Sequence, residues 1–154
     1  MIAVIQRIKK GSVSVEGRTS GTCGQGLCVL LGVAKEDTGA DAEVLAKKIL
    51  NLRIFTDEDG KMNRSLLDVD GEMLLISNFT LLASYKKGNR PDYMNAAAPA
   101  EADRLYRYFG SLCEQSLKHV GYGVFGAHMH IDLACDGPVT ITMDSKMLRP
   151  TGTK

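Results

Sequence analysis

The chain has 154 residues, of which 44% are hydrophobic and 24% charged, and its formal net charge is +1 at pH 7. This length favours one domain that buries about two-thirds of the surface exposed by its unfolded state. No stretch approaches the roughly 18 apolar residues of a membrane span. The opening MIAVIQRIKK is too short and too soon charged for a signal peptide. The small net charge argues against a protein that wraps duplex nucleic acid, but it is compatible with binding a short single-stranded RNA end.

The first third of the chain predicts strands. An apolar run at 2–8 and an alternating stretch at 12–15 predict a pair of N-terminal strands, and residues 21–26 have the composition of a turn. The continuous apolar run at 27–33 predicts a strand buried on both faces.

A first helix is predicted to begin at Asp37 or Thr38, where a capping residue precedes a helical stripe. The stripe consists of Ala42, Leu45, Ala46, Ile49 and Leu52. Residues 53–55 then predict a short strand, 56–65 a loop, and 72–76 another buried strand.

A second helix is predicted to begin near Pro99, a residue suited to the first helical turn, and to end at Gly121 and Gly123. Its apolar stripe consists of Leu105, Phe109, Leu112, Cys113 and Leu117. The last strands are expected on either side of Gly137-Pro138, and residues 146–154 are expected to form a tail after a domain at 1–145. The pattern is that of a single α/β domain with about six strands and two helices.

Four cysteines, Cys23, Cys28, Cys113 and Cys135, form no C-x-x-C pair. Without an export signal, they are expected to be reduced thiols, mostly buried, in a cytoplasmic protein.

Gly137-Pro138 interrupts a stretch that otherwise has the composition of a strand. Proline cannot donate to a strand ladder and glycine weakens a strand interior, so the pair predicts an edge, a bulge or a turn. One interpretation is a hairpin turn. The other is that the backbone is presented to a ligand.

Three further patterns resemble known binding or catalytic motifs. GYGVFG at 121–126 matches the letters of the dinucleotide-binding fingerprint, which follows a strand and opens a helix. Here a predicted helix precedes the motif and a predicted strand follows it, so a dinucleotide site is rejected. His128 and His130 lie two apart on a predicted strand and would share a face, which leaves a metal site open as an alternative. Ser77 or Thr80 as a nucleophile with a histidine base is a further alternative.

Six stretches together resemble the D-aminoacyl-tRNA deacylases in order and spacing, from the first residue to about Ser145. They are QR at 6–7, GKMN at 60–63, SNFTL at 77–81, KGNRP at 87–91, FGAHM at 125–129 and GPVT at 137–140. The resemblance implies a compact α/β domain with a mostly antiparallel, barrel-like sheet and two helices. It also implies a homodimer whose active sites lie at the subunit interface.

The resemblance carries over to particular residues. The family's Ser-Gln-Phe-Thr stretch, taken as catalytic, corresponds to Ser77, Asn78, Phe79 and Thr80. Gly137-Pro138 corresponds to a cis dipeptide inserted into the partner's pocket, and Arg7 to the residue that fixes this loop. Phe125 and Met129 correspond to substrate-binding residues, with Phe125 packing against the terminal adenosine. The family usually has Gln in place of Asn78 and Asn in place of Cys135.

The implied activity is hydrolysis of the ester between a D-amino acid and the 3′ end of tRNA, with some cleavage of glycyl-tRNA and no cofactor or metal. The N–H groups of Phe79 and Thr80 are the expected oxyanion donors. Lys86, Lys87 and Arg90 are expected to contact tRNA phosphates. Three alternatives remain: an editing relative with relaxed or L-alanine specificity, a non-catalytic module that binds tRNA ends, and a metal-dependent hydrolase using His128 and His130.

Overall fold

One long strand, β1 (Ile2–Val15), organises the sheet in the computed structural model, which describes residues 1–150. It pairs antiparallel with β2 (Arg18–Cys23), β3 (Gly26–Gly32) and β8 (His130–Asp144). The prediction of two separate N-terminal strands was therefore wrong. Because β8 pairs with both halves of β1, the strand continues through Gly11. A Cβ at Gly11 would lie 2.9 Å from the Leu133 side chain.

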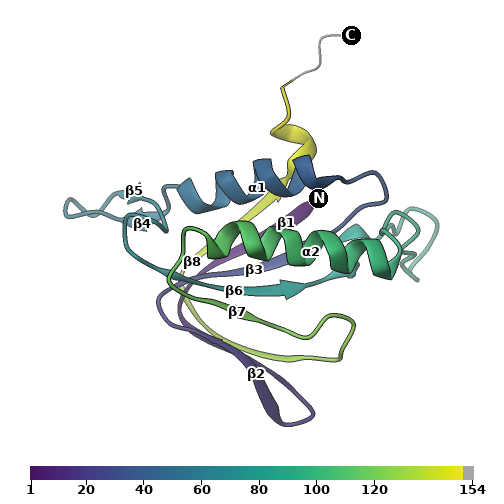
Figure 1. Cartoon of the computed structure of the whole chain (residues 1–154), viewed down its shortest axis with the longest axis horizontal. Helices are drawn as coiled ribbons and strands as arrows, with labels where there is room; N and C mark the ends of the chain where they lie inside the picture. Colours follow the sequence, from purple (N-terminus) through teal and green to yellow (C-terminus); the bar gives the residue numbers. More distant parts are fainter. Residues whose placement is uncertain (151–154) are drawn as a thin grey trace.

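The remaining strands of the main sheet are parallel. β6 (Glu72–Ser77) pairs with β3, and β7 (Val120–Tyr122) pairs with β6, giving the order β2-β1-β3-β6-β7 with β8 on β1. The two parallel connections run through α1 (Gly39–Asn51) and α2 (Pro99–Glu114), which lie on the same face of the sheet (Figure 1). Both helices begin where the sequence predicts.

Helix α1 is fixed at its start by a capping box. The backbone N–H of Thr38 donates to Asp41 Oδ2 at 2.8 Å, which is the half of the box made by the third helical residue. The Asp41 N–H also donates to the Thr38 carbonyl at 3.0 Å. Helix α2 starts at Pro99, whose missing N–H costs nothing in the first turn. The Tyr108 hydroxyl joins the two helices by donating to Glu43 at 2.7 Å.

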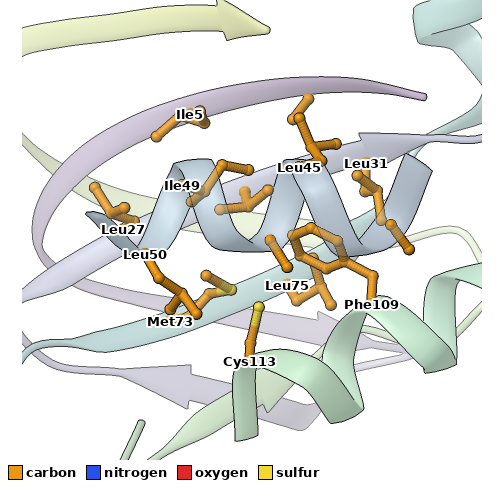
Figure 2. Close-up of a cluster of buried hydrophobic side chains, with 14 of the residues drawn as sticks. Ile5, Leu27, Leu31, Leu45, Ile49, Leu50, Met73, Leu75, Phe109 and Cys113 are labelled. Carbon is orange, nitrogen blue, oxygen red and sulfur yellow. The ribbon is translucent and has the colours of Figure 1, made fainter. Parts of the chain in front are cut away.

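The main core lies between the helices and the sheet (Figure 2). Side chains from both helices and three strands meet there, among them Ile5, Leu31, Leu45, Ile49, Leu75 and Phe109, all at most 1% exposed. A smaller apolar cluster covers the other face of the sheet and consists of Ile8, Val13, Cys23, Cys28, Leu74 and Ile76. Two buried apolar faces explain why the central strands are apolar without alternation.

Helix α2 ends at Glu114, not at the glycines predicted to terminate it. Gly121 lies inside β7, where a Cβ would stand 2.4 Å from the carbonyl oxygen of Thr22 in β2. Gly21 of β2 is similarly confined by the backbone of Tyr122. These close approaches bring the two ends of the sheet together, so that it nearly closes into a barrel. The single α/β domain with two helices and a barrel-like sheet is confirmed.

Smaller elements complete the domain. A hairpin of β4 (Phe55–Thr56) and β5 (Met62–Arg64) occupies most of the predicted loop at 56–65. Two 3₁₀ turns follow later, η1 (Phe79–Leu82) and η2 (Ser145–Met147). The predicted tail at 146–154 lies partly outside the described residues, but Arg149 forms an ion pair with Asp41 of α1.

Three of the four cysteines are buried, as expected, and Cys135 is exposed. Burial raises the pKa of Cys23, Cys28 and Cys113 to about 12, which keeps these thiols protonated at neutral pH. Within residues 1–150, no helix is long and apolar enough to cross a membrane.

Candidate functional site

A cavity of about 790 Å³ opens where β6 ends and α2 begins. We call it the main cavity. Its lining includes Ser77, Asn78, Phe79, Thr80, Tyr93, Pro99, Tyr106, Phe125, His128 and Met129. The structure thus brings together six of the predicted site residues, from two segments about 50 positions apart in the chain.

The Ser77–Thr80 stretch is shaped by the end of the sheet. Ser77 is the last residue of β6 and lies opposite Leu31 of β3. The Asn78 N–H then donates to the Leu31 carbonyl at 2.8 Å, and Asn78 becomes the residue that precedes η1. The Thr80 hydroxyl donates to the Asn78 side-chain oxygen. The strand end and the 3₁₀ turn therefore hold the stretch in a defined conformation.

The start of η1 leaves backbone donors at the cavity. In a 3₁₀ turn each N–H donates to the carbonyl three residues earlier, so the first N–H groups have no partner inside the turn. The Leu81 N–H donates to the Asn78 carbonyl at 3.3 Å, which leaves the N–H groups of Phe79 and Thr80 as those first donors. Two adjacent N–H groups can stabilise an oxyanion.

The opposite wall is apolar. Phe125 packs against Tyr106 with ring centroids 6.0 Å apart, and the Met129 sulfur lies so close to Gly123 that a Cβ there would be 2.6 Å from it. The Tyr106 hydroxyl is occupied, since it donates to the Leu75 carbonyl at 2.8 Å, and burial raises its pKa. Tyr106 therefore forms part of the cavity wall, and its hydroxyl is not available as a general acid.

An aromatic pair stands at the mouth of the main cavity. Phe79, 57% exposed, meets Tyr93 edge to face with ring centroids 5.0 Å apart. Ile131 at the same mouth is 39% exposed. Tyr93 and Tyr106 were missed by the sequence reasoning. The helical spacing of Tyr106 from Ala102 and Phe109 was the available signal for Tyr106, whereas Tyr93 follows a loop without periodicity.

The two histidines do not share a strand face, so that prediction was wrong. His128 lies in the loop before β8 and lines the main cavity, whereas His130 is the first residue of β8. Their rings are perpendicular, with centroids 5.3 Å apart. Residues 1–150 contain no group of three or more His, Cys, Asp or Glu side chains placed to hold a metal.

Gly137 and Pro138 lie outside the main cavity of their own chain and are exposed. The hairpin interpretation was wrong, because β8 continues from His130 to Asp144. Cys135 lies opposite Ile8 and Thr140 opposite Gln6, so β1 and β8 lose register between these pairs and the Gly-Pro segment bulges out. The Gly137-Pro138 peptide bond is cis, and Gly137 has φ +137°.

Arg7 holds the base of this bulge. Its side chain is buried, and its Nε donates to the Asp136 carbonyl at 3.0 Å while Nη1 donates to the Ile54 carbonyl at 2.7 Å. The Asp136 carboxylate lies 3.5 Å from Nε. Arg7 and Asp136 also line a second, small cavity of about 250 Å³ beside the β4–β5 hairpin. The predicted site residues thus fall into two groups, one around the main cavity and one around the bulge.

Comparison with known proteins identifies the family of the chain. The sequence model of the D-Tyr-tRNA(Tyr) deacylase family matches residues 4–144. A D-aminoacyl-tRNA deacylase of Caldicellulosiruptor saccharolyticus is 51% identical over 146 residues, covering 95% of this chain and 98% of the relative. The D-aminoacyl-tRNA deacylase of Thermosipho africanus is 53% identical with the same coverage.

Two solved structures share the fold. The c-Myc DNA Unwinding Element Binding Protein superposes with a TM-score of 0.88 at 40% identity, covering 94% of this chain and 98% of that one. A probable eukaryotic D-amino acid tRNA deacylase gives a TM-score of 0.80 at 17% identity, covering 93% and 98%, and so supports the fold alone. On the extent of the family match and the identity of these relatives, the chain belongs to the D-Tyr-tRNA(Tyr) deacylase family.

Proposed function

We propose that the protein hydrolyses the ester bond of D-aminoacyl-tRNA and releases the free D-amino acid and tRNA. The observation that carries the proposal is the main cavity, which Ser77–Thr80 line together with Phe125 and Met129. An apolar cavity with a few convergent polar groups is the usual form of a small-ligand site. Here it suits an aminoacyl group on a terminal nucleoside. Because the substrate serves translation, we place the activity in the cytoplasm.

The chemistry needs little from side chains, because an aminoacyl ester is already activated. Hydrolysis requires a positioned water and a place for the oxyanion of the tetrahedral intermediate. We assign the second role to the N–H groups of Phe79 and Thr80, since removing one such donor typically costs on the order of 10²–10³ in rate. The ribose 2′-hydroxyl of the substrate helps to activate the water. Thr80, whose hydroxyl is bonded to Asn78, positions the substrate and does not attack it.

The location of the Gly-Pro bulge supports a homodimer. Gly137 and Pro138 are exposed and lie outside the main cavity of their own chain, whereas the mouth of that cavity carries exposed apolar side chains, including Phe79 and Ile131. Exposed apolar groups around a cavity are typical of an interface. In our proposal the bulge of each subunit enters the main cavity of the other and completes it.

Selection of the D-enantiomer then works by exclusion. The backbone carbonyls of the inserted Gly-Pro segment accept hydrogen bonds from the substrate's α-ammonium and fill the space where an L side chain would project. A D side chain points elsewhere, and glycine has none. We expect cleavage of D-aminoacyl-tRNA and some cleavage of glycyl-tRNA, with little preference among D side chains because no residue binds the D side chain specifically.

Deacylation of D-tyrosyl-tRNA distinguishes this proposal from its rivals. We expect multiple turnovers that survive a chelator and the pair His128→Ala and His130→Ala. Binding without turnover would indicate a non-catalytic module. Loss of activity with the chelator would indicate a metal-dependent hydrolase. Hydrolysis of L-alanyl-tRNA in preference to D-tyrosyl-tRNA would indicate an editing relative of altered specificity.

A further inference from the structure

Residues 85–91 form an exposed loop between the bridged residues Ser84 and Asp92, and the next residue along the chain, Tyr93, lines the main cavity. We call residues 85–91 the basic loop. It contains Lys86, Lys87 and Arg90 and no acidic residue. All of its residues are exposed, and Tyr85 is 77% exposed. Within residues 1–150, none of its three cations takes part in an ion pair, whereas six other cationic side chains do. The loop thus presents uncompensated positive charge and an aromatic ring to solvent.

The base of the loop is fixed to the cavity. Ser84 and Asp92 exchange two backbone hydrogen bonds, each 2.8 Å long. Just outside this bridge, Phe79 packs on Tyr93, and both rings line the main cavity. The chain beyond Tyr93 is tied to the segment that follows β3, since the Lys35 N–H donates to the Asn95 carbonyl at 3.1 Å. Figure 1 shows the surrounding segment between the end of β6 and the start of α2.

The tip of the loop is free by comparison. Gly88 has φ +139°, and a Cβ there would meet nothing within 4 Å. The nearest acidic side chain along the chain, Asp92, accepts a hydrogen bond from the Met94 N–H at 3.2 Å. From Ser84, four extended residues would reach at most about 13 Å outward. The loop is therefore long enough to contact a chain that leaves the main cavity past Tyr93.

We propose that the basic loop binds the phosphodiester backbone of the single-stranded RNA end that leads out of the main cavity, with Tyr85 stacking on an unpaired base. Cations beside an exposed aromatic ring are the features that bind single strands without sequence preference. This inference rests on the proposed function, because the terminal nucleoside must occupy the main cavity for the next phosphates to pass the loop.

The test compares two substrates that differ in phosphate content. The triple variant Lys86→Ala, Lys87→Ala, Arg90→Ala is assayed with D-tyrosyl-tRNA and with D-tyrosyl-adenosine, an ester without phosphates. For the tRNA we expect KM to rise about tenfold or more and kcat to stay within about twofold, since uniform binding is lost. For the adenosine ester we expect no change. The matched control, Lys47→Ala, Lys48→Ala, Lys61→Ala, removes three exposed cations elsewhere and should behave as the unmodified protein.

Salt dependence separates charge from stacking. Each phosphate contact on a single strand contributes about 0.7 to the slope of log affinity against log salt, so the triple variant should have a slope shallower by about 2. Tyr85→Ala should weaken tRNA binding about fivefold or more at an unchanged slope, and Tyr85→Phe should restore it. Binding of uncharged tRNA by fluorescence anisotropy gives this readout without turnover.

Three results would overturn the proposal: normal tRNA kinetics in the triple variant, equal loss with both substrates, or a change in its oligomeric state. Failure of the unmodified protein to deacylate either ester would contradict the proposed function. In that case the anisotropy measurement would still decide whether the basic loop binds RNA.

Discussion

Arg7 and Asp136, 129 positions apart in the chain, are joined by a hydrogen bond of 3.0 Å from the Arg7 Nε to the Asp136 carbonyl. The same guanidinium donates from Nη1 to the Ile54 carbonyl at 2.7 Å. One buried side chain of β1 thus ties the residue before the Gly-Pro bulge of β8 to the neighbouring strand and to the segment at Ile54. The planar guanidinium fork serves two carbonyls at once, and an ammonium cannot reproduce that geometry.

Arg7→Lys should therefore loosen the bulge. Loss of one or both hydrogen bonds to buried carbonyls should lower the free energy of unfolding by about 1–3 kcal/mol. If the bulge excludes L side chains, the D-to-L ratio of deacylation rates should also fall, by about tenfold or more. Chemical denaturation and paired deacylation assays measure the two effects. A variant with lowered stability and an unchanged ratio would refute the role of Arg7 in selection.

Gly137→Ala should damage the bulge directly. Gly137 has φ +137°, and a Cβ there would lie 2.6 Å from the Val139 nitrogen, so alanine must shift the backbone. We expect deacylation of D-tyrosyl-tRNA to fall by at least about a hundredfold, with a stability cost of about 1–3 kcal/mol. Gly60→Ala is the matched control: φ is +78°, nothing lies within 4 Å, and the residue belongs to the β4–β5 hairpin. Equal activities of the two variants would contradict the assignment.

Thr80→Ala separates positioning from nucleophilic attack. The Thr80 hydroxyl donates to the Asn78 side chain, so its removal should cost one hydrogen bond and reduce kcat/KM by about tenfold or less. Removal of a covalent nucleophile would cost on the order of 10⁶, as in subtilisin. Single-turnover kinetics with acid quench and mass spectrometry should detect no acyl-Thr80 ester. Trapping that ester would overturn the mechanism.

Asp41 should make stability depend on pH. Burial by itself would raise the pKa of Asp41, but hydrogen bonds from the Thr38 N–H, the Ser145 hydroxyl and Arg149 hold the pKa below its ordinary value. A folded-state pKa below the unfolded one, about 3.9, gives stability that is present above that pH and lost as pH falls through the folded pKa. Asp41→Ala should lower the free energy of unfolding at pH 7 by about 2–4 kcal/mol.

The difference between Asp41→Ala and the unmodified protein should shrink as the pH is lowered from 7 to about 3, because protonation of Asp41 removes from the unmodified protein a contribution that the variant already lacks. Urea titrations at the two pH values measure it. A constant difference would mean that Asp41 stabilises the fold without its charge.

Much of the fold was predictable because it depends on local periodicity and caps. Thr38 and Pro99 mark the starts of the two helices, and the apolar runs at 27–33 and 72–76 predict the two central strands. The strand and helix boundaries were wrong where residues distant in the sequence determine the local structure. Gly11 continues a strand because β8 pairs across it, and Gly121 lies in β7 because β2 crosses within van der Waals contact.

The candidate site was predictable only where a short motif carries it. Ser77–Thr80, Phe125 and Met129 meet in one cavity, but for Gly137-Pro138 the residue pattern left an edge, a bulge and a turn open, and the structure shows a bulge of β8. The position of the bulge is determined by the register of β1 against β8. This register depends on two segments that are far apart in the sequence, so the local pattern around Gly137 does not determine it. Tyr93 was missed because its position depends on the Ser84–Asp92 bridge.

The most direct test of the account is the ratio of deacylation rates for D-tyrosyl-tRNA and L-tyrosyl-tRNA, measured side by side with the unmodified protein. The account predicts rapid loss of the D-ester, while the L-ester decays no faster than it does without protein. Comparable cleavage of both esters, or stability of both, would contradict the claim that this cavity and the Gly137-Pro138 bulge select by handedness.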